Sequence, residues 1–397
     1  MDIATAQWLV SEGGREALRQ ADAWADPTSV SAAQGMRRQW NAEQSAAALS
    51  QTRLRRRAAL KFGAGAGSLF YTSDGLEQAT RPAVAAWRAT RFVQAGVSTI
   101  WDLGCGIGAD ALAFAAAGLR VIGVERDPVT AIFAQANLGQ GVEVLTGEVA
   151  ELVGAGPTGR PGPQPGEGIF CDPARRTDRG RSWRVQDFSP SWEFVTRLLT
   201  GNASVCVKVG PGIPRALIPD AAHATWVSES GDLVEASLWA GFPALGAGAA
   251  EALLLPGGHM LLGEPGSDPV PAEIGRFLYE PDPAVIRAGA LARLADDLDA
   301  GAIAPGIAYL SGDRLEDTPF AEAFEVLEVL PTAEKTVRAW VRNHDIGVLE
   351  IKKRGIDVDP AELRRRLRPA GTHKATLVLT PTSAGAVALV VRRISRA

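Results

Sequence analysis

From about residue 98 onward, short apolar runs alternate with stretches whose apolar residues recur at helical spacing. Helical patterns such as Ala109–Ala117 and Pro128–Leu138 separate the first of these runs. An alternation of this kind predicts an α/β domain with a mostly parallel sheet and right-handed crossover connections. The predicted strands are Thr99–Leu103, Arg120–Val124, Val142–Leu145, Ile169–Cys171, Ser204–Val209, Thr225–Ser228 and Val234–Trp239.

The pattern differs on both sides of this domain. Residues 1–95 have apolar positions at helical spacing, interrupted by turn formers, and predict a helical N-terminal region. The α/β domain is expected over residues 96–262, and a Gly- and Pro-rich linker separates it from a small mixed region at 272–330. Residues 331–397 predict a further α/β domain. Its expected elements are the helices Lys335–Asn343 and Pro360–Leu367 and the strands Gly347–Lys352, Ala375–Thr380 and Ala386–Arg392.

The chain of 397 residues has a net charge of -4, but its charges are unevenly divided. Residues 331–397 hold 14 Lys and Arg against 6 Asp and Glu, a net charge of +8. Residues 1–330 hold the remaining 27 basic and 39 acidic side chains, a net charge of -12. A basic C-terminal domain on an acidic body favours a polyanionic partner for that domain. The alternative is a basic surface that contacts only water.

Cysteine and histidine usage argues against a metal centre. The three cysteines, Cys105, Cys171 and Cys206, are widely spaced, and neither they nor the four histidines show the spacing of zinc ligands. An odd number of separated cysteines is typical of a reducing compartment. The spacing of these residues therefore predicts no bound metal ion. The sequence also shows neither a signal-peptide pattern nor an apolar run long enough to span a membrane, so we expect a cytoplasmic protein.

A glycine-rich segment, Asp102-Leu103-Gly104-Cys105-Gly106-Ile107-Gly108, joins the first predicted strand to a helix. Glycines let the backbone turn with positive φ and approach a ligand closely, and the helix N-terminus offers N–H groups to an anion. The next strand ends at Glu125, 23 residues after Asp102, where a carboxylate is able to accept hydrogen bonds from ribose hydroxyls. A dinucleotide site would also satisfy this spacing. The acids Glu148 and Asp172, after the third and fourth strands, instead favour an adenosyl ligand with a charged amino-acid tail.

These motifs resemble those of class I S-adenosylmethionine-dependent methyltransferases, over about Phe70 to Gly241. The resemblance implies a Rossmann-like sheet and S-adenosyl-L-methionine as the cofactor. It also implies that Glu125 holds the ribose and that Glu148 lies near the adenine. The residues expected around the methionine part belong to the first motif, which begins at Asp102 and includes Gly104, Gly106 and Gly108.

Two polar residues before the first strand, Gln78 and Thr80, are candidates for contacts to the amino-acid end of the cofactor. The reason is the resemblance, because in this family such a segment often covers the cofactor. The alternative is a helix with Ser73 or Asp74 as its N-cap, whose other polar residues lie only on the helix surface.

The expected acceptor site is Asp172-Pro173-Ala174-Arg175, at the carboxyl end of the fourth strand, where ligands collect in open α/β sheets. Family members that methylate amino groups usually have Asp or Asn, Pro, Pro and an aromatic residue here, so Ala174 and Arg175 differ from that pattern. We expect Asp172 to orient the attacking N–H or O–H group. We expect Arg175 to clamp a substrate phosphate, with a surface ion pair as the alternative. Nothing marks any of the three cysteines as a nucleophilic thiolate.

The C-terminal segment from about 331 to 395 resembles the THUMP-like domain that follows a methyltransferase domain in a bacterial protein family, and the region before it resembles that family's ferredoxin-like part. The matching stretches include Lys335–Trp340, Gly347–Gly355 and Gly371–Leu379. THUMP domains bind RNA, so the resemblance implies a tRNA or rRNA substrate. Contacts from basic side chains to phosphates would supply affinity without sequence choice. The candidates are Lys352, Lys353, Arg354, Arg364, Arg365, Arg366, Arg368 and Lys374.

The sequence therefore predicts an S-adenosylmethionine-dependent methyltransferase that acts on RNA docked by the basic domain. One alternative is a methyltransferase for a small molecule or a protein. Another is a non-catalytic RNA-binding protein that keeps the cofactor fold. An NAD-dependent oxidoreductase is the third alternative, because the glycine spacing also fits a dinucleotide.

Overall fold

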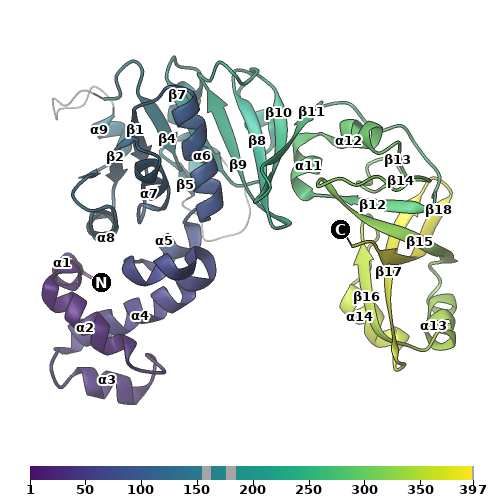
Figure 1. Cartoon of the computed structure of the whole chain (residues 1–397), viewed down its shortest axis with the longest axis horizontal. Coiled ribbons are helices and arrows are strands. Elements are labelled where there is room, and N and C mark those ends of the chain that lie inside the picture. The colour runs from purple at the N-terminus through teal and green to yellow at the C-terminus, as the bar shows by residue number, and fades with distance from the viewer. Residues whose placement is uncertain (154–161, 176–184, 396–397) are drawn as a thin grey trace. The chain divides into compact units, whose positions relative to one another are not determined.

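The computed structural model describes residues 1–153, 162–175 and 185–395 (Figure 1). The chain forms two compact units. The first comprises residues 1–223 and 236–248, and the second comprises residues 224–235 and 249–397. Within the described residues, no helix is both long and apolar enough to cross a membrane.

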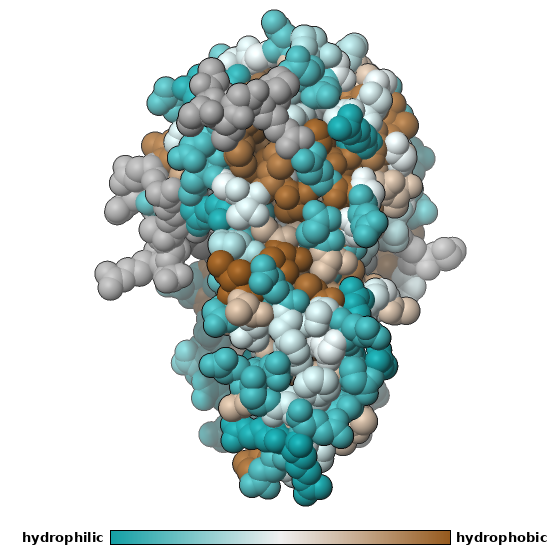
Figure 2. All heavy atoms as spheres, turned by 90° about the vertical axis from the view of Figure 1, so that its left-hand side faces the viewer, coloured by the Kyte–Doolittle hydropathy of each residue, from teal (hydrophilic) through white to brown (hydrophobic). Residues whose placement is uncertain are grey.

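The N-terminal part of the first unit is helical, as the spacing of its apolar residues predicted. Side chains fix the helix starts: Ser11 accepts a hydrogen bond from the backbone N–H of Gly14, and Asn41 and Gln44 form a reciprocal capping box. Buried aliphatic and aromatic side chains pack these helices together and against Phe133. The outer surface of this part, low in Figure 2, is mostly hydrophilic. The helices are α1 (Ile3–Val10), α2 (Glu12–Asp22), α3 (Val30–Met36), α4 (Ala42–Phe62), the 3₁₀ helix η1 (Gly63–Ser68), α5 (Ser73–Gln78) and α6 (Pro82–Gln94).

The sheet of the first unit has the strand order β3-β2-β1-β4-β7-β9. Neighbouring strands pair in parallel from β3 to β7, and β9 runs antiparallel to β7. A buried aromatic cluster that includes Phe92 of α6, Phe114 of α7 and Trp239 of β9 packs the helices onto the sheet. The elements are β1 (Thr99–Leu103), α7 (Ala109–Ala116), β2 (Arg120–Glu125), α8 (Pro128–Leu138), β3 (Glu143–Thr146), α9 (Val149–Leu152), β4 (Gly168–Cys171), β5 (Ala174–Arg175), η2 (Val185–Asp187), β6 (Phe188–Ser189), α10 (Trp192–Leu199), β7 (Ser204–Val209), η3 (Arg215–Leu217) and β9 (Asp232–Ala240).

The predicted bounds of β1, α8 and β7 are confirmed, and the other predicted strands of this domain differ by one or two residues. Because β1, β2, β4 and β7 are parallel, their carboxyl ends lie along one edge of the sheet. The residues that follow these strands are therefore brought together at that edge, which is where open α/β sheets bind ligands.

The second unit begins with β8 (His223–Glu229), of which the residues from Ala224 onward belong to it. β8 pairs in parallel with β10 (Ala250–Leu255), and β11 (His259–Gly263) pairs antiparallel with β10. Helices α11 (Pro283–Ala288) and α12 (Leu291–Asp297) pack against these strands, so closely that a Cβ on Gly263 would lie 2.0 Å from the carbonyl oxygen of Ala288. This packing groups β10 and β11 with the second unit, although the sequence analysis assigned them to residues 96–262.

The rest of the second unit is a seven-stranded sheet of order β13-β14-β12-β15-β18-β17-β16. Its strands pair antiparallel except for β16 and β17, which are parallel. Strand β15 pairs with β12 on one side and β18 on the other, so the predicted regions 272–330 and 331–397 contribute strands to one sheet. The elements are β12 (Phe277–Pro281), β13 (Gly301–Ala302), β14 (Leu310–Gly312), β15 (Ala321–Pro331), α13 (Glu334–Asn343), β16 (Ile346–Lys353), α14 (Pro360–Leu367), β17 (His373–Thr382) and β18 (Gly385–Arg393).

Candidate active site

The glycine-rich loop follows β1 directly, as the sequence predicted. Gly104, Gly106 and Gly108 all have positive φ, between 55° and 88°, a conformation that side chains with a Cβ rarely adopt. A Cβ on Gly104 would also lie only 3.1 Å from the backbone oxygen of Asp172, so the loop packs against the chain that leaves β4. Gly108 is the N-cap residue of α7, whose first N–H groups border the loop.

Glu125 lies at the end of β2 and faces this loop. Its Oε2 accepts a hydrogen bond of 3.0 Å from the Gly106 N–H, and its Oε1 accepts one of 2.9 Å from the Asp127 N–H. Burial raises the pKa of the Glu125 carboxyl, although these two backbone N–H groups lower it. The two hydrogen bonds hold the carboxylate in one orientation beside the loop. Glu148, the residue before α9, is exposed.

Asp102 is buried at the end of β1, with 1% of its surface exposed. Neither of its carboxylate oxygens has a hydrogen-bond partner among the described residues. Burial raises the pKa of Asp102 well above its ordinary value, and the charges of Asp110 and Asp172 raise it further, whereas Arg88 and Lys208 lower it. A buried carboxylate without donors is unusual, and the ammonium group of an amino-acid ligand would supply them. The site therefore fits a ligand of that chemistry.

A second group of buried polar residues lies beneath the loop. Thr80 donates a hydrogen bond of 2.6 Å from its hydroxyl to Asp110, and Arg88 of α6 donates to the other oxygen of the same carboxylate. The Arg88 guanidinium also lies over the Phe170 ring, 4.5 Å from its centroid. The structure thus places Thr80 close to the loop but bonded to Asp110. Sequence patterns did not identify the role of Arg88, because an arginine in a helix is usually exposed.

The alternative interpretation of this segment, a capped helix, is correct about the helix but names the wrong cap. The N-cap is Thr72, whose hydroxyl oxygen accepts a hydrogen bond of 3.1 Å from the Gly75 N–H, and neither Ser73 nor Asp74 takes that part. Gln78 ends the helix, and its backbone oxygen accepts a hydrogen bond of 3.1 Å from Lys208.

Asp172 lies directly after β4, at the edge where the parallel strands end. Its Oδ2 is 2.6 Å from Nζ of Lys208 on the neighbouring strand β7. The register explains this pair, because Cys171 lies opposite Val207 and the next residues are therefore adjacent. Lys208 was not among the predicted site residues, although a lysine near the carboxyl end of an otherwise apolar strand was an available signal. Arg175 has its backbone in β5, and its side chain lies outside the described part of the structure.

The cysteines do not have the environment of nucleophiles. All three are buried and none forms a disulfide. Burial raises the pKa of the Cys105 and Cys171 thiols well above the ordinary value, and the neighbouring carboxylate of Asp102 raises both further. In the described part of the chain, no group of three His, Cys, Asp or Glu side chains is arranged to hold a metal ion.

Comparison with known proteins shows the family of this chain and the family's cofactor. An uncharacterized S-adenosylmethionine-dependent methyltransferase of Mycobacterium tuberculosis, found in two strains, is 32% identical over 356 residues, which cover 87% of this chain and 95% of the relative. The chain belongs to this family of S-adenosylmethionine-dependent methyltransferases. Its cofactor is S-adenosyl-L-methionine, and the NAD-dependent alternative is wrong.

The other comparisons concern the fold of the chain and two of its segments. The crystal structure of a protein assigned as a methyltransferase, from Porphyromonas gingivalis W83, has a TM-score of 0.75 at 22% identity and covers 99% of this chain and 98% of its own. The THUMP domain-like family matches residues 321–393 of the methyltransferase, and a domain of unknown function (DUF8688) matches residues 2–58. The THUMP-like resemblance of the C-terminal segment is thereby confirmed.

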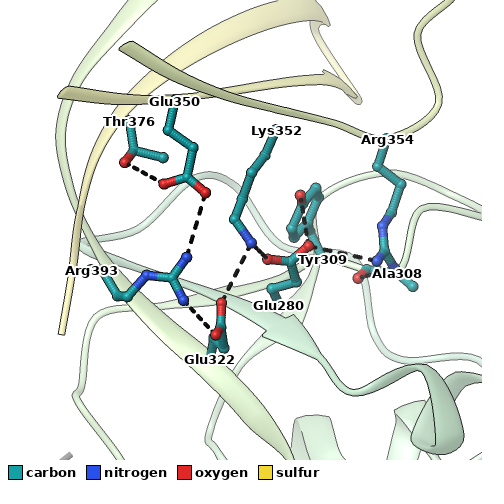
Figure 3. A network of polar contacts seen from close by, with 9 residues as sticks. All are labelled: Glu280, Ala308, Tyr309, Glu322, Glu350, Lys352, Arg354, Thr376 and Arg393. Atoms are coloured by element: carbon teal, nitrogen blue, oxygen red, sulfur yellow. Dashed lines mark hydrogen bonds and ion pairs between the residues drawn. The ribbon is translucent and has the colours of Figure 1, made fainter. Parts of the chain in front are cut away.

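The basic candidates of this THUMP-like domain fall into two groups. Lys352 contacts Glu280 and Glu322, and Arg354 donates to the Ala308 carbonyl and lies near Glu280. Figure 3 shows both side chains within a network that continues through Arg393 to Glu350. Arg364 donates to the backbone oxygen of Leu349, and Arg366 pairs with Glu334 and Glu362. The other four candidates are exposed, and none forms an ion pair within the described residues: Lys353, Arg365, Arg368 and Lys374.

The network of Figure 3 also borders a cavity of about 960 Å³ in the second unit. Glu280 and Glu322 line this cavity together with Lys352, Arg354 and Arg393. Because carboxylates face the same space as the cations, a phosphate entering the cavity would meet repulsion as well as attraction. We therefore assign no phosphate contact to the network.

Proposed function

We propose that this methyltransferase acts on RNA, either tRNA or rRNA, held by its basic C-terminal domain. The observation that carries the proposal is the THUMP-like match at residues 321–393. The net charge of +8 over residues 331–397 supports it, because phosphate binding needs cations that are not already neutralised. The supporting side chains are the four exposed cations Lys353, Arg365, Arg368 and Lys374.

Three of these four cations lie on or next to helix α14. Lys353 ends β16, and both it and Arg365 lie close enough to Asp359, the N-cap of α14, to lower the pKa of its carboxyl, after the larger effect of the Glu362 N–H. Arg368 is the C-cap of α14, and Lys374 lies near the start of β17. In the proposal they contact successive phosphates and fix the position of the RNA, while base choice is left to the acceptor site.

In the proposed reaction, S-adenosyl-L-methionine supplies an electrophilic methyl group when it is bound. Asp102 accepts hydrogen bonds from the ammonium end of the cofactor, and Glu125 accepts them from its ribose. Asp172, at the edge of the sheet beside the loop, orients the acceptor toward the methyl group. Positioning of this kind supplies much of the rate enhancement of a displacement reaction, so no protein nucleophile is needed.

We further propose that the reaction takes place in the cytoplasm. The support is the set of three free, buried cysteines, because unpaired thiols are typical of proteins in reducing compartments.

The test is to incubate the protein with total cellular RNA and S-adenosylmethionine labelled in its methyl group, and to identify labelled nucleosides by mass spectrometry. We expect one labelled nucleoside with the wild-type protein and a loss of about 100-fold or more with Asp172→Ala, in line with the loss of an orienting group. Asp357→Ala, which removes an exposed carboxylate of the C-terminal domain, serves as the control and should retain activity. Label that appears only in protein or small molecules would contradict the RNA proposal.

A further inference from the structure

Two lysine side chains meet at the C-terminal end of helix α5. Lys61 donates hydrogen bonds of 3.1 and 3.2 Å to the backbone oxygens of Leu76 and Glu77, and Lys208 donates one of 3.1 Å to that of Gln78. Consecutive carbonyl groups at a helix end lie within one turn, and they lack partners inside the helix. Lys61 therefore lies near Lys208, whose charge it feels, and Lys208 in turn contacts Asp172.

The two lysines differ in their partners. Lys208 is 2.6 Å from the Asp172 carboxylate, which stabilises its charged form, and only 14% of its side chain is exposed. Lys61 has no ion pair among the described residues, and the nearest carboxylate in its surroundings, that of Glu77, pairs with Arg57 instead. Among the described residues, Lys61 thus has no carboxylate partner comparable to the one that Lys208 has.

The surroundings of Lys61 favour its neutral form. Burial lowers the pKa of the Lys61 amine to about 8, and the positive charges of Lys208, Arg81 and Arg57 contribute, against a raising effect of Glu77. A neutral amine has two N–H groups and one lone pair. Because Leu76 and Glu77 accept from both N–H groups, the lone pair remains available to accept a proton.

A proton acceptor near the Lys208–Asp172 pair bears on which atom receives the methyl group. A ring nitrogen or amine can attack with its own lone pair, whereas a hydroxyl must lose its proton to become an effective nucleophile. The chain also has Ala174 and Arg175 where an aromatic residue would be needed to stack a base. Both observations favour an oxygen acceptor.

We propose that Lys61 accepts the proton of a hydroxyl group that Asp172 and Lys208 hold in place, so that the methyl group is transferred to oxygen. The assignment rests on the proposed function, and with an RNA substrate the acceptor is a ribose hydroxyl. The hydroxyl oxygen forms a bond to the methyl carbon while the carbon–sulfur bond breaks, and its electron pair remains on sulfur, giving the neutral thioether S-adenosylhomocysteine. The hydroxyl proton passes to the Lys61 amine, and the resulting ammonium releases it to water.

The first test measures Lys61 directly on the full-length protein. Acetic anhydride reacts only with neutral amines, so acetylation followed by mass spectrometry across about pH 6 to 11 reports the ionisation of each lysine. We expect half-maximal acetylation of Lys61 near pH 8, and the exposed Lys335 provides the reference profile in the same sample. In Lys208→Met the midpoint for Lys61 should rise, because a neighbouring positive charge is lost. A Lys61 profile that matches Lys335 would overturn the proposal.

The second test identifies the product and its pH dependence. We expect a methyl group on a ribose oxygen, a rate that falls as the pH is lowered below about 8, and a loss of about 100-fold in Lys61→Arg, which stays charged and cannot accept a proton. Binding of S-adenosylhomocysteine should be unchanged in Lys61→Arg, with Lys335→Arg as the matched control. A methyl group on a base nitrogen or carbon would overturn the oxygen assignment and leave RNA methylation intact. If no RNA is methylated, the proposed function fails. The acetylation profile still reports, independently of any substrate, whether Lys61 is neutral near pH 8.

Discussion

The two units of the molecule differ in whether they bury a basic side chain. In the first unit, Arg88, Asp110 and Asp102 are buried around the glycine-rich loop. Arg88 donates a hydrogen bond to Asp110, and the charge of Asp110 contributes to the raised pKa of Asp102, after the larger effect of burial. In the second unit, the basic side chains lie at or near the surface, and half of the candidates for RNA contact are already bonded to carboxylates or carbonyls.

This difference predicts different consequences of substitution. Removing a buried charge leaves its partner in a low-dielectric environment without compensation, so the cost falls on the stability of the fold. Removing an exposed, unpaired cation costs little stability, and its effect falls on the binding of a charged partner. The comparison can therefore be tested by measuring stability and affinity separately.

The largest effect is expected from Arg88→Met. The substitution leaves Asp110 buried with only the Thr80 hydroxyl as a described donor, and breaking a buried ion pair in this way costs about 3–5 kcal/mol. Urea unfolding followed by circular dichroism measures the free energy of unfolding. The matched control is Arg57→Met, because Arg57 and Glu77 form an ion pair in which both side chains are 56% exposed. An equal loss in the two variants would remove the distinction between buried and exposed charges.

The next effect concerns cofactor affinity. Glu125→Ala removes the acceptor of the Gly106 N–H and, in our assignment, the acceptor of the ribose hydroxyls. Hydrogen bonds to charged groups contribute about 1.5–3 kcal/mol each, so we expect the affinity for S-adenosylhomocysteine to fall about 100-fold in calorimetry. Glu151→Ala removes an exposed carboxylate of α9 and should bind normally. Normal binding by Glu125→Ala would show that the ribose lies elsewhere.

The sequence predicted the architecture of the first unit well, because its signals are local. Alternating apolar runs locate β1, α8 and β7 correctly, and the spacing of Gly104, Gly106 and Gly108 predicts a loop whose backbone requires glycine. Local signals were weaker where several residue types compete for one position. Thr72, Ser73 and Asp74 are all good N-caps, and only the backbone geometry selects Thr72.

Long-range pairing could not be predicted from these signals. Lys352 pairs with Glu280, 72 residues earlier in the chain, because β16 and β12 belong to the same sheet. Lys208 likewise contacts Asp172 only because β4 and β7 are neighbours in a parallel register. A count of basic residues therefore overestimates the number available to a partner, because it includes basic side chains that form ion pairs in the folded protein.

The smallest expected effect separates the two groups of basic residues in the second unit. Replacing the four exposed cations with alanine should weaken RNA binding at physiological salt and leave thermal stability nearly unchanged. It should also reduce the slope of log affinity against log salt by about 3, since each phosphate contact on a single strand contributes about 0.7. Filter binding at increasing salt measures both quantities. The substitutions are Lys353→Ala, Arg365→Ala, Arg368→Ala and Lys374→Ala.

The control for this variant must remove the same charge from the other unit, because any loss of four positive charges weakens long-range attraction to RNA. Four exposed arginines of the first unit serve this purpose, and their removal should lower the affinity slightly without changing the salt slope. An equal change of slope in both variants would mean that RNA is attracted by overall charge, with no docking surface around α14. The control substitutions are Arg37→Ala, Arg38→Ala, Arg53→Ala and Arg120→Ala.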